Sequence, residues 1–80
     1  MDDAVSLALF RKERNDALRS LDAAQITAFS RKWGAPLPPT EGQFWAGVHK
    51  ARLNCTDMTP EEQEASRRWL AEHGYRATIG

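Results

Sequence analysis

The chain has 80 residues, enough for one small domain that buries only about 60 to 65% of the surface of its unfolded chain. Eleven basic and eleven acidic side chains cancel, which removes the strongest sequence argument for nonspecific binding to nucleic acid or membranes. The single cysteine, Cys55, excludes an internal disulfide framework and favours a reducing, cytoplasmic compartment. The apolar run near the N-terminus is short and follows acidic residues, so we expect neither a secretory signal nor a membrane span.

Residues 4–20 are predicted to form the first helix, capped by Asp2 or Asp3. Its apolar side chains recur at spacings of three and four along one face: Leu7, Phe10, Ala17, Leu18 and Leu21. Arg14 falls inside this stripe. We expect its aliphatic stem to lie along the apolar face while the guanidinium reaches water or a carboxylate, and the alternative is a contact with a partner.

A second helix is predicted over residues 23–33. Asp22 would cap it, and Leu21 would pack on Ile26 as a hydrophobic staple. Gly34 supplies a left-handed residue that ends the helix. The following Ala-Pro-Leu-Pro-Pro run cannot continue it, because three prolines lack a backbone donor, and so a stiff connector follows.

The third predicted helix, residues 41–53, begins at a Thr40 cap and carries the segment Phe-Trp-Ala-Gly-Val-His-Lys-Ala-Arg. At 100° per residue, one apolar arc contains Phe44, Gly47, Val48 and Ala51. Trp45, His49 and Arg52 border this arc, and Lys50 lies on the far side. We expect Gly47 to permit the close approach of another helix.

The fourth predicted helix, residues 60–73, has the clearest start in the chain, with Thr59 as cap, Pro60 in the first position and Glu62 reaching back. We expect an inner side made of Ala65, Trp69, Leu70 and His73. Glu64 and Arg68 are spaced for an ion pair, and Gly74 closes the helix. Residues 75–80 are predicted to be an extended or frayed tail, with Tyr75 and Ile79 as candidates to fold back.

These elements predict an all-α chain: a compact bundle of three to four helices, forming one domain over residues 1–80, with a proline-rich connector between helices two and three. Aromatic side chains would supply much of so small a core. Trp33, Phe44 and Trp69 are the aromatic residues that we expect to be buried.

Catalytic and metal-binding patterns are not evident. His49, Cys55, Asp57 and His73 are eligible metal ligands, but they match none of the usual paired spacings. Nothing in the spacing brings a base to Cys55. The paired acids sit where helix starts favour negative charge. We therefore expect no enzyme, no cofactor and no metal.

Nucleic-acid binding is a more serious possibility than catalysis, because each predicted helix carries basic residues close together. These are Arg11 with Lys12, Arg31 with Lys32, Lys50 with Arg52, and Arg67 with Arg68. Gathered on one side, they would form a basic stripe, with residues 40–53 as the recognition helix of a helix-turn-helix arrangement. The three prolines before this helix, where a short turn would be expected, weigh against that reading.

The chain resembles a set of small helical proteins of unknown function encoded by tailed phages and prophages. The resemblance lies in Phe44-Trp45 with residues 48–52, in the proline-rich connector before them, and in Trp69-Leu70 with His73-Gly74 after them. The resemblance covers most of residues 13–75. It implies a bacterial cytoplasmic setting and an accessory role, and it transfers no catalytic residue.

We therefore expect a non-enzymatic protein that binds a host or phage protein, or a second copy of itself. Aromatic residues beside cations are common at the centres of protein interfaces. Trp45, His49, Lys50 and Arg52 are the residues predicted to contact the partner. A DNA-binding or regulatory domain is the alternative.

Overall fold

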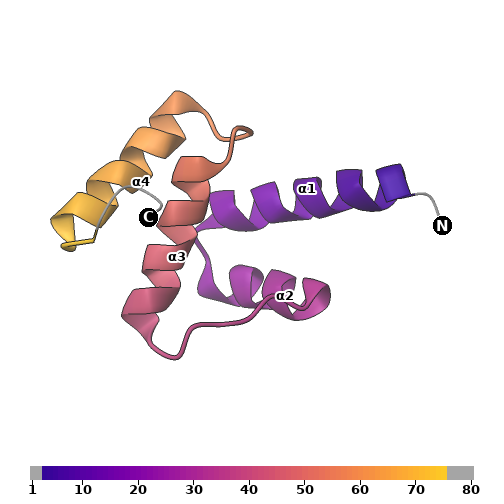
Figure 1. Cartoon of the computed structure of the whole chain (residues 1–80), viewed down its shortest axis with the longest axis horizontal. Helices are drawn as coiled ribbons and strands as arrows, with labels where there is room; N and C mark the ends of the chain where they lie inside the picture. Colours follow the sequence, from indigo (N-terminus) through magenta and orange to yellow (C-terminus); the bar gives the residue numbers. More distant parts are fainter. Residues whose placement is uncertain (1–2, 76–80) are drawn as a thin grey trace. The chain divides into compact units, whose positions relative to one another are not determined.

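The computed structural model describes residues 3–75, with side chains from residue 5 onward. This part of the chain contains four helices and no strand (Figure 1): α1 (Asp3–Ser20), α2 (Ala23–Trp33), α3 (Glu41–Asn54) and α4 (Pro60–Glu72). The all-α class is confirmed, and every helix boundary falls within one residue of the prediction. Across residues 3–75, none of these helices has the length and apolar character needed to cross a membrane.

The helices pack as two pairs. Residues 1–37 make up the N-terminal unit, in which α1 packs on α2, and residues 38–80 make up the C-terminal unit, in which α3 packs on α4. Residues 35–40 are non-helical, as the prolines predict. The expectation of one domain over residues 1–80 stays a prediction.

Side-chain caps begin three of the helices. Asp22 accepts a hydrogen bond from the backbone N–H of Ala24 at 2.8 Å, which starts α2. Thr40 caps α3 in the same way. α4 begins with a capping box, in which two residues bond each other reciprocally. Thr59 Oγ1 accepts from the Glu62 N–H at 3.1 Å, and Glu62 Oε1 accepts from the Thr59 N–H at 2.8 Å. These caps confirm the predicted helix starts.

Left-handed residues follow three of the helices, whereas α3 ends at Cys55 in an extended conformation. Gly34 has φ of 72° after α2, and Gly74 has φ of 77° after α4, both as predicted. Leu21 also has a positive φ, 50°, at the end of α1. A leucine pays a steric cost in this conformation because its β-carbon approaches the following carbonyl oxygen.

The core of the N-terminal unit consists of Ala17, Leu18 and Ile26, all buried. Beside it, Phe10 packs on Phe29 and Trp33, with ring centroids 5.5 and 5.2 Å apart. The Arg14 guanidinium lies over the Phe10 ring, 5.9 Å from its centroid, so its stem follows the apolar face as expected.

Two members of the predicted α1 stripe are not in this core. Leu7 is 60% exposed and Leu21 is 44% exposed. Leu7 precedes Phe10, which packs on Trp33 at the very end of α2, so α2 is too short to cover it. Leu21 has already left the helix with its positive φ.

The C-terminal unit has a core of small and medium-sized side chains: Ala46, Val48, Cys55, Met58 and Leu70. The predicted inner arc of α3 is wrong in its centre, because Gly47 and Ala51 are exposed while His49 and Arg52 are buried. A β-carbon at Gly47 would meet nothing within 4 Å, so no helix approaches there. Gly47 and Ala51 have little apolar surface to bury, whereas His49 gains a ring contact on α4.

The inner face of α4 also differs from the prediction. Ser66 and Leu70 are fully buried, while Ala65 and His73 are exposed. Glu64 pairs with Arg67, at 3.4 Å, instead of with Arg68. Trp33, Phe44 and Trp69, predicted to be buried, are only half-buried.

Candidate functional site

The four residues predicted to contact a partner have unequal access to solvent. His49 and Arg52 are 6% and 5% exposed, and Trp45 and Lys50 are half-buried. Trp45 packs edge-on against Phe44, with centroids 5.0 Å apart. Of these four residues, only Trp45 and Lys50 therefore offer appreciable surface, and the role of the four in binding stays a prediction.

His49 lies inside the contact between α3 and α4. Its ring stacks on Trp69 at 4.3 Å, and a hydrogen bond of 3.0 Å joins its Nδ1 to Ser66 Oγ. His73 stacks on the same indole at 3.9 Å, and its Nδ1 donates to the Trp69 carbonyl oxygen at 2.8 Å. Tyr75 lies nearly parallel to Trp69 at 6.0 Å. We call these five residues (His49, Ser66, Trp69, His73 and Tyr75) the imidazole–indole cluster.

Burial, together with the nearby charges of Arg52 and His73, lowers the pKa of His49 from 6.5 to about 4. The folded C-terminal unit therefore holds a neutral imidazole at His49 over the whole neutral range. A neutral imidazole beside a serine hydroxyl is also found in nucleophilic sites, but Ser66 is fully buried, so its hydroxyl cannot meet a substrate from solvent.

Arg52 is an unusual core residue. Its guanidinium is buried, and within residues 5–75 its Nε has no hydrogen-bond partner. Buried charges are normally paired, because an unpaired one loses its hydration without compensation. Periodicity placed Arg52 at the border of the apolar arc and gave no signal for its burial.

The eligible metal ligands do not converge. Within the described side chains, no three or more His, Cys, Asp or Glu residues are placed to hold a metal ion. Cys55, the single cysteine of the chain, is buried. The structure of this region thus supplies no arrangement of side chains to which a metal or thiol reaction can be assigned.

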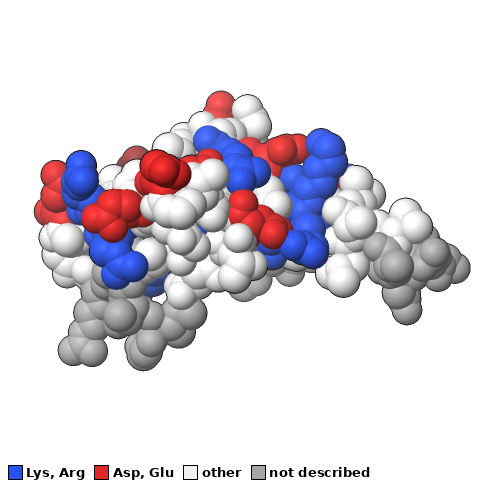
Figure 2. Space-filling view, turned by 90° about the horizontal axis from the view of Figure 1, so that it is seen from above, with Lys and Arg blue, Asp and Glu red and all other residues white. Residues whose placement is uncertain are grey.

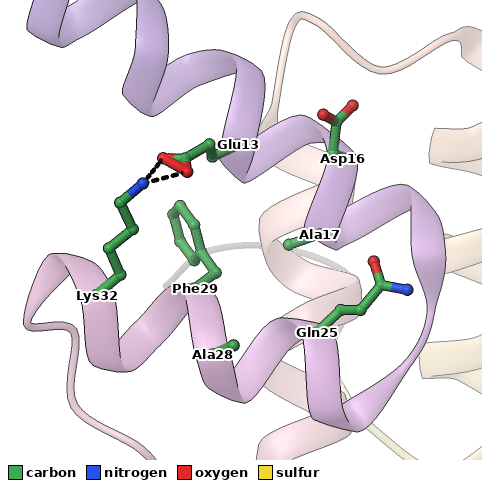
Figure 3. Close-up of a pocket in the computed structure, with 7 residues that line it drawn as sticks. All are labelled: Glu13, Asp16, Ala17, Gln25, Ala28, Phe29 and Lys32. Atoms are coloured by element: carbon green, nitrogen blue, oxygen red, sulfur yellow. Dashed lines mark hydrogen bonds and ion pairs between the residues drawn. The ribbon is translucent and has the colours of Figure 1, made fainter.

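A groove of about 300 Å³ runs between α1 and α2 (Figure 3). Ala17, Ala28 and Phe29 line its apolar part. Figure 3 shows Lys32 Nζ bonded to both carboxylate oxygens of Glu13, at 2.9 Å for Oε2. Trp33 Nε1, which the figure does not draw, donates to the same carboxylate at 3.1 Å. These charged groups are thus engaged within the unit, and the groove is shallow and open.

Exposed apolar side chains gather instead at the start of α1. Val5, Leu7 and Leu9 are 64%, 60% and 46% exposed. The helix has 18 residues against 11 in α2, and Figure 1 shows its first turns extending past the end of its partner. We call this segment, residues 3–9, the α1 overhang. The sequence did contain a signal for it, because the first helix was predicted to be longer than the second.

The predicted basic groupings lie among acidic side chains. Figure 2 shows Lys and Arg side chains interspersed with Asp and Glu on the face that it draws. Three of the predicted basic groupings contribute to ion pairs within the chain, namely Lys12 with Asp16, Lys32 with Glu13, and Arg67 with Glu64. Such pairing reduces the positive potential available to a phosphate backbone.

Comparisons of the chain with known protein families, with characterised proteins and with solved structures find no match.

Proposed function

We propose that this chain is a small non-enzymatic helical protein that acts through protein–protein contacts, and that the α1 overhang is its main contact surface. The observation that carries the proposal is the exposure of Val5, Leu7 and Leu9. Val5 and Leu9 are four residues apart and share one side of α1, whereas Leu7 lies nearly opposite them. Apolar side chains left uncovered on both sides of a helical segment are typical of a surface that a partner covers. Each of them would contribute apolar area that the unit itself does not bury.

The proposed main contact surface is the α1 overhang instead of the predicted surface on α3, of which a part is retained. Trp45 and Lys50 keep partial exposure, so they are proposed as secondary contacts. His49 and Arg52 are buried in the structure, which weakens the support for direct contacts by them. The bacterial cytoplasmic setting and the phage or prophage accessory role are likewise proposed, and they rest on the sequence pattern of residues 44–52 and 69–74.

Affinity capture from bacterial lysate tests the proposal, with nuclease treatment in parallel to remove nucleic acid. The test variant is Leu7→Glu combined with Leu9→Glu, which places two charges on the overhang. The matched control adds two charges elsewhere, by Ala24→Glu and Ala71→Glu, on exposed positions of α2 and α4. All chains are first checked for parental helix content by circular dichroism.

We expect the parent and the control to retain the same protein after nuclease treatment, and the overhang variant to lose it. Sedimentation of the pure chain tests a second copy as the partner in the same series. Equal capture by the overhang variant and the parent would remove the α1 overhang as the contact surface. Capture that depends on nucleic acid and weakens steeply with salt would favour the DNA-binding alternative.

A further inference from the structure

Within the imidazole–indole cluster, His49 occupies a position where a positive charge is unfavourable. His49 is buried between its own helix and α4, where its neighbours are a hydroxyl, Ser66, and an indole, Trp69. The charged groups that act on it are Arg52 on α3 and His73 on α4, and both are cations when charged. Among the described residues, no carboxylate acts on His49 to balance a proton.

We propose that the C-terminal unit contains an acid-sensitive switch, in which protonation of His49 releases α4 from α3. A protonated His49 would lie near the Arg52 guanidinium and would lack the hydration that it has in water, so the charged form is unfavourable in the folded unit. The ring stays in this position only while α3 and α4 are paired, because Trp69, on which it stacks, belongs to α4. Separation of the two helices returns the imidazolium to water. The N-terminal unit has no histidine, so the switch acts on one unit of the chain.

The direction of the pH dependence follows from the two protonation equilibria. The pKa of His49 is about 4 in the folded unit and 6.5 in the unfolded chain, so the unfolded chain binds the proton more readily. This contribution to stability is fully present above pH 6.5 and is lost as the pH falls from 6.5 toward 4. Between pH 7 and pH 5, the unfolding constant of the C-terminal unit should rise about 20-fold.

The experiment uses the full chain with Trp33→Phe, so that the remaining tryptophans, Trp45 and Trp69, both report on the C-terminal unit. Urea unfolding is followed by fluorescence at pH 7 and pH 5. We expect the roughly 20-fold increase in the unfolding constant in this chain. The added substitution His49→Gln should remove most of that increase, because the amide can still hydrogen-bond Ser66 but does not titrate.

The matched control is His73→Gln, which removes the exposed imidazole and should keep most of the increase. An unchanged unfolding constant between pH 7 and pH 5 in the Trp33→Phe chain would overturn the switch. So would the same pH dependence with and without His49→Gln.

A direct titration keeps the proposal testable if His49→Gln does not fold. The imidazole C–H resonances of the parent chain are followed by NMR from pH 8 to pH 4, with His73→Gln used to assign them. We expect the His49 resonance to keep its neutral position down to about pH 5 and to move only as the unit opens. A His49 resonance that titrates at 6.5 in the folded chain would contradict the proposal.

Discussion

Gly42 leaves the space that the Tyr75 hydroxyl occupies, since a β-carbon built at Gly42 would lie 2.9 Å from Tyr75 Oη. The contact joins the first turn of α3 to the residue that follows the α4 end. Tyr75 is held there by its backbone N–H, which donates to the Leu70 carbonyl oxygen at 2.8 Å, and by its ring beside Trp69. The expectation that Tyr75 folds back is confirmed, whereas Ile79 lies outside the described residues.

The Gly42–Tyr75 contact predicts a non-additive pair of substitutions. Alanine favours a helix over glycine by up to about 1 kcal/mol, but at Gly42 the methyl group would displace the tyrosine hydroxyl. We expect Gly42→Ala to stabilise the chain clearly in a Tyr75→Phe background and much less in the parent. Urea unfolding of the four chains of the cycle measures the difference, and equal effects in both backgrounds would contradict the contact.

The positive φ of Leu21 predicts that glycine at this position stabilises the chain. Its φ of 50° costs a leucine about 1 to 2 kcal/mol, which exceeds the entropy cost of a glycine in the unfolded chain. Leu21→Gly should therefore raise the free energy of unfolding by about 0.5 kcal/mol. Urea unfolding followed by Trp33 fluorescence measures it, in a chain that carries Trp45→Phe and Trp69→Phe so that Trp33 is the remaining tryptophan. Leu37 is equally exposed but has no positive φ, so Leu37→Gly, as the control, should give no gain.

Leu70 is the most deeply buried large side chain described in the structure, and its truncation should be severe. We expect Leu70→Ala to cost about 2 to 5 kcal/mol, because it removes apolar contacts and leaves a cavity between α3 and α4. That is comparable with the whole stability of a small domain. Leu7→Ala, at an exposed position, should cost much less in the same thermal unfolding assay, and equal costs would place the core elsewhere.

Glu13 predicts an acid response of the N-terminal unit that is distinct from that of His49. Hydrogen bonds from Lys32 and Trp33 and the charge of Lys32 lower the pKa of Glu13 below 4.5. Its contribution is therefore present above pH 4.5 and lost as the pH falls through the lower folded value. Glu13→Gln should reduce the pH dependence of the unfolding free energy of the N-terminal unit below pH 4.5. Urea unfolding followed by Trp33 fluorescence in a chain with Trp45→Phe and Trp69→Phe measures this, and Asp16→Asn serves as the control.

Arg52 predicts a link between a buried cation and the imidazole. Its charge is the second cause, after burial, of the lowered pKa of His49. Arg52→Met should raise that pKa part of the way toward 6.5, because burial still opposes the charged form. NMR titration of His49 measures the shift. Lys50→Met, on a residue that does not act on His49, should leave the titration unchanged.

The sequence was a good guide where local chemistry decides the structure. Asp22, Thr40 and Thr59 were each recognisable as helix caps, because a short polar side chain that accepts from the first free N–H groups is favoured by local geometry alone. Gly34 and the prolines that follow it were equally clear as the end of α2. The class and the helix bounds follow from these residues.

Helix orientation was harder to predict, because it depends on the partner helix. The spacing of α3 favoured Gly47 and Ala51 as inner residues, but their side chains contribute little apolar area. His49 turned inward because α4 offers it a hydroxyl and an indole, and neither can be placed against α3 from the sequence of α3. The exposure of the α1 overhang has the same origin, since it depends on which helix packs on α1, and the sequence did not show that this helix is the shorter α2.

The α1 overhang also has a consequence for local dynamics. Its backbone hydrogen bonds belong to a helix that has no neighbour to support it there, and an isolated helical turn is only marginally stable in water. Amide protons in the first turns of α1 should thus exchange with solvent faster than those near Leu18. A partner that covers Val5 and Leu9 would slow this exchange, so the exchange rate of these amide protons shows whether a partner is bound to the overhang.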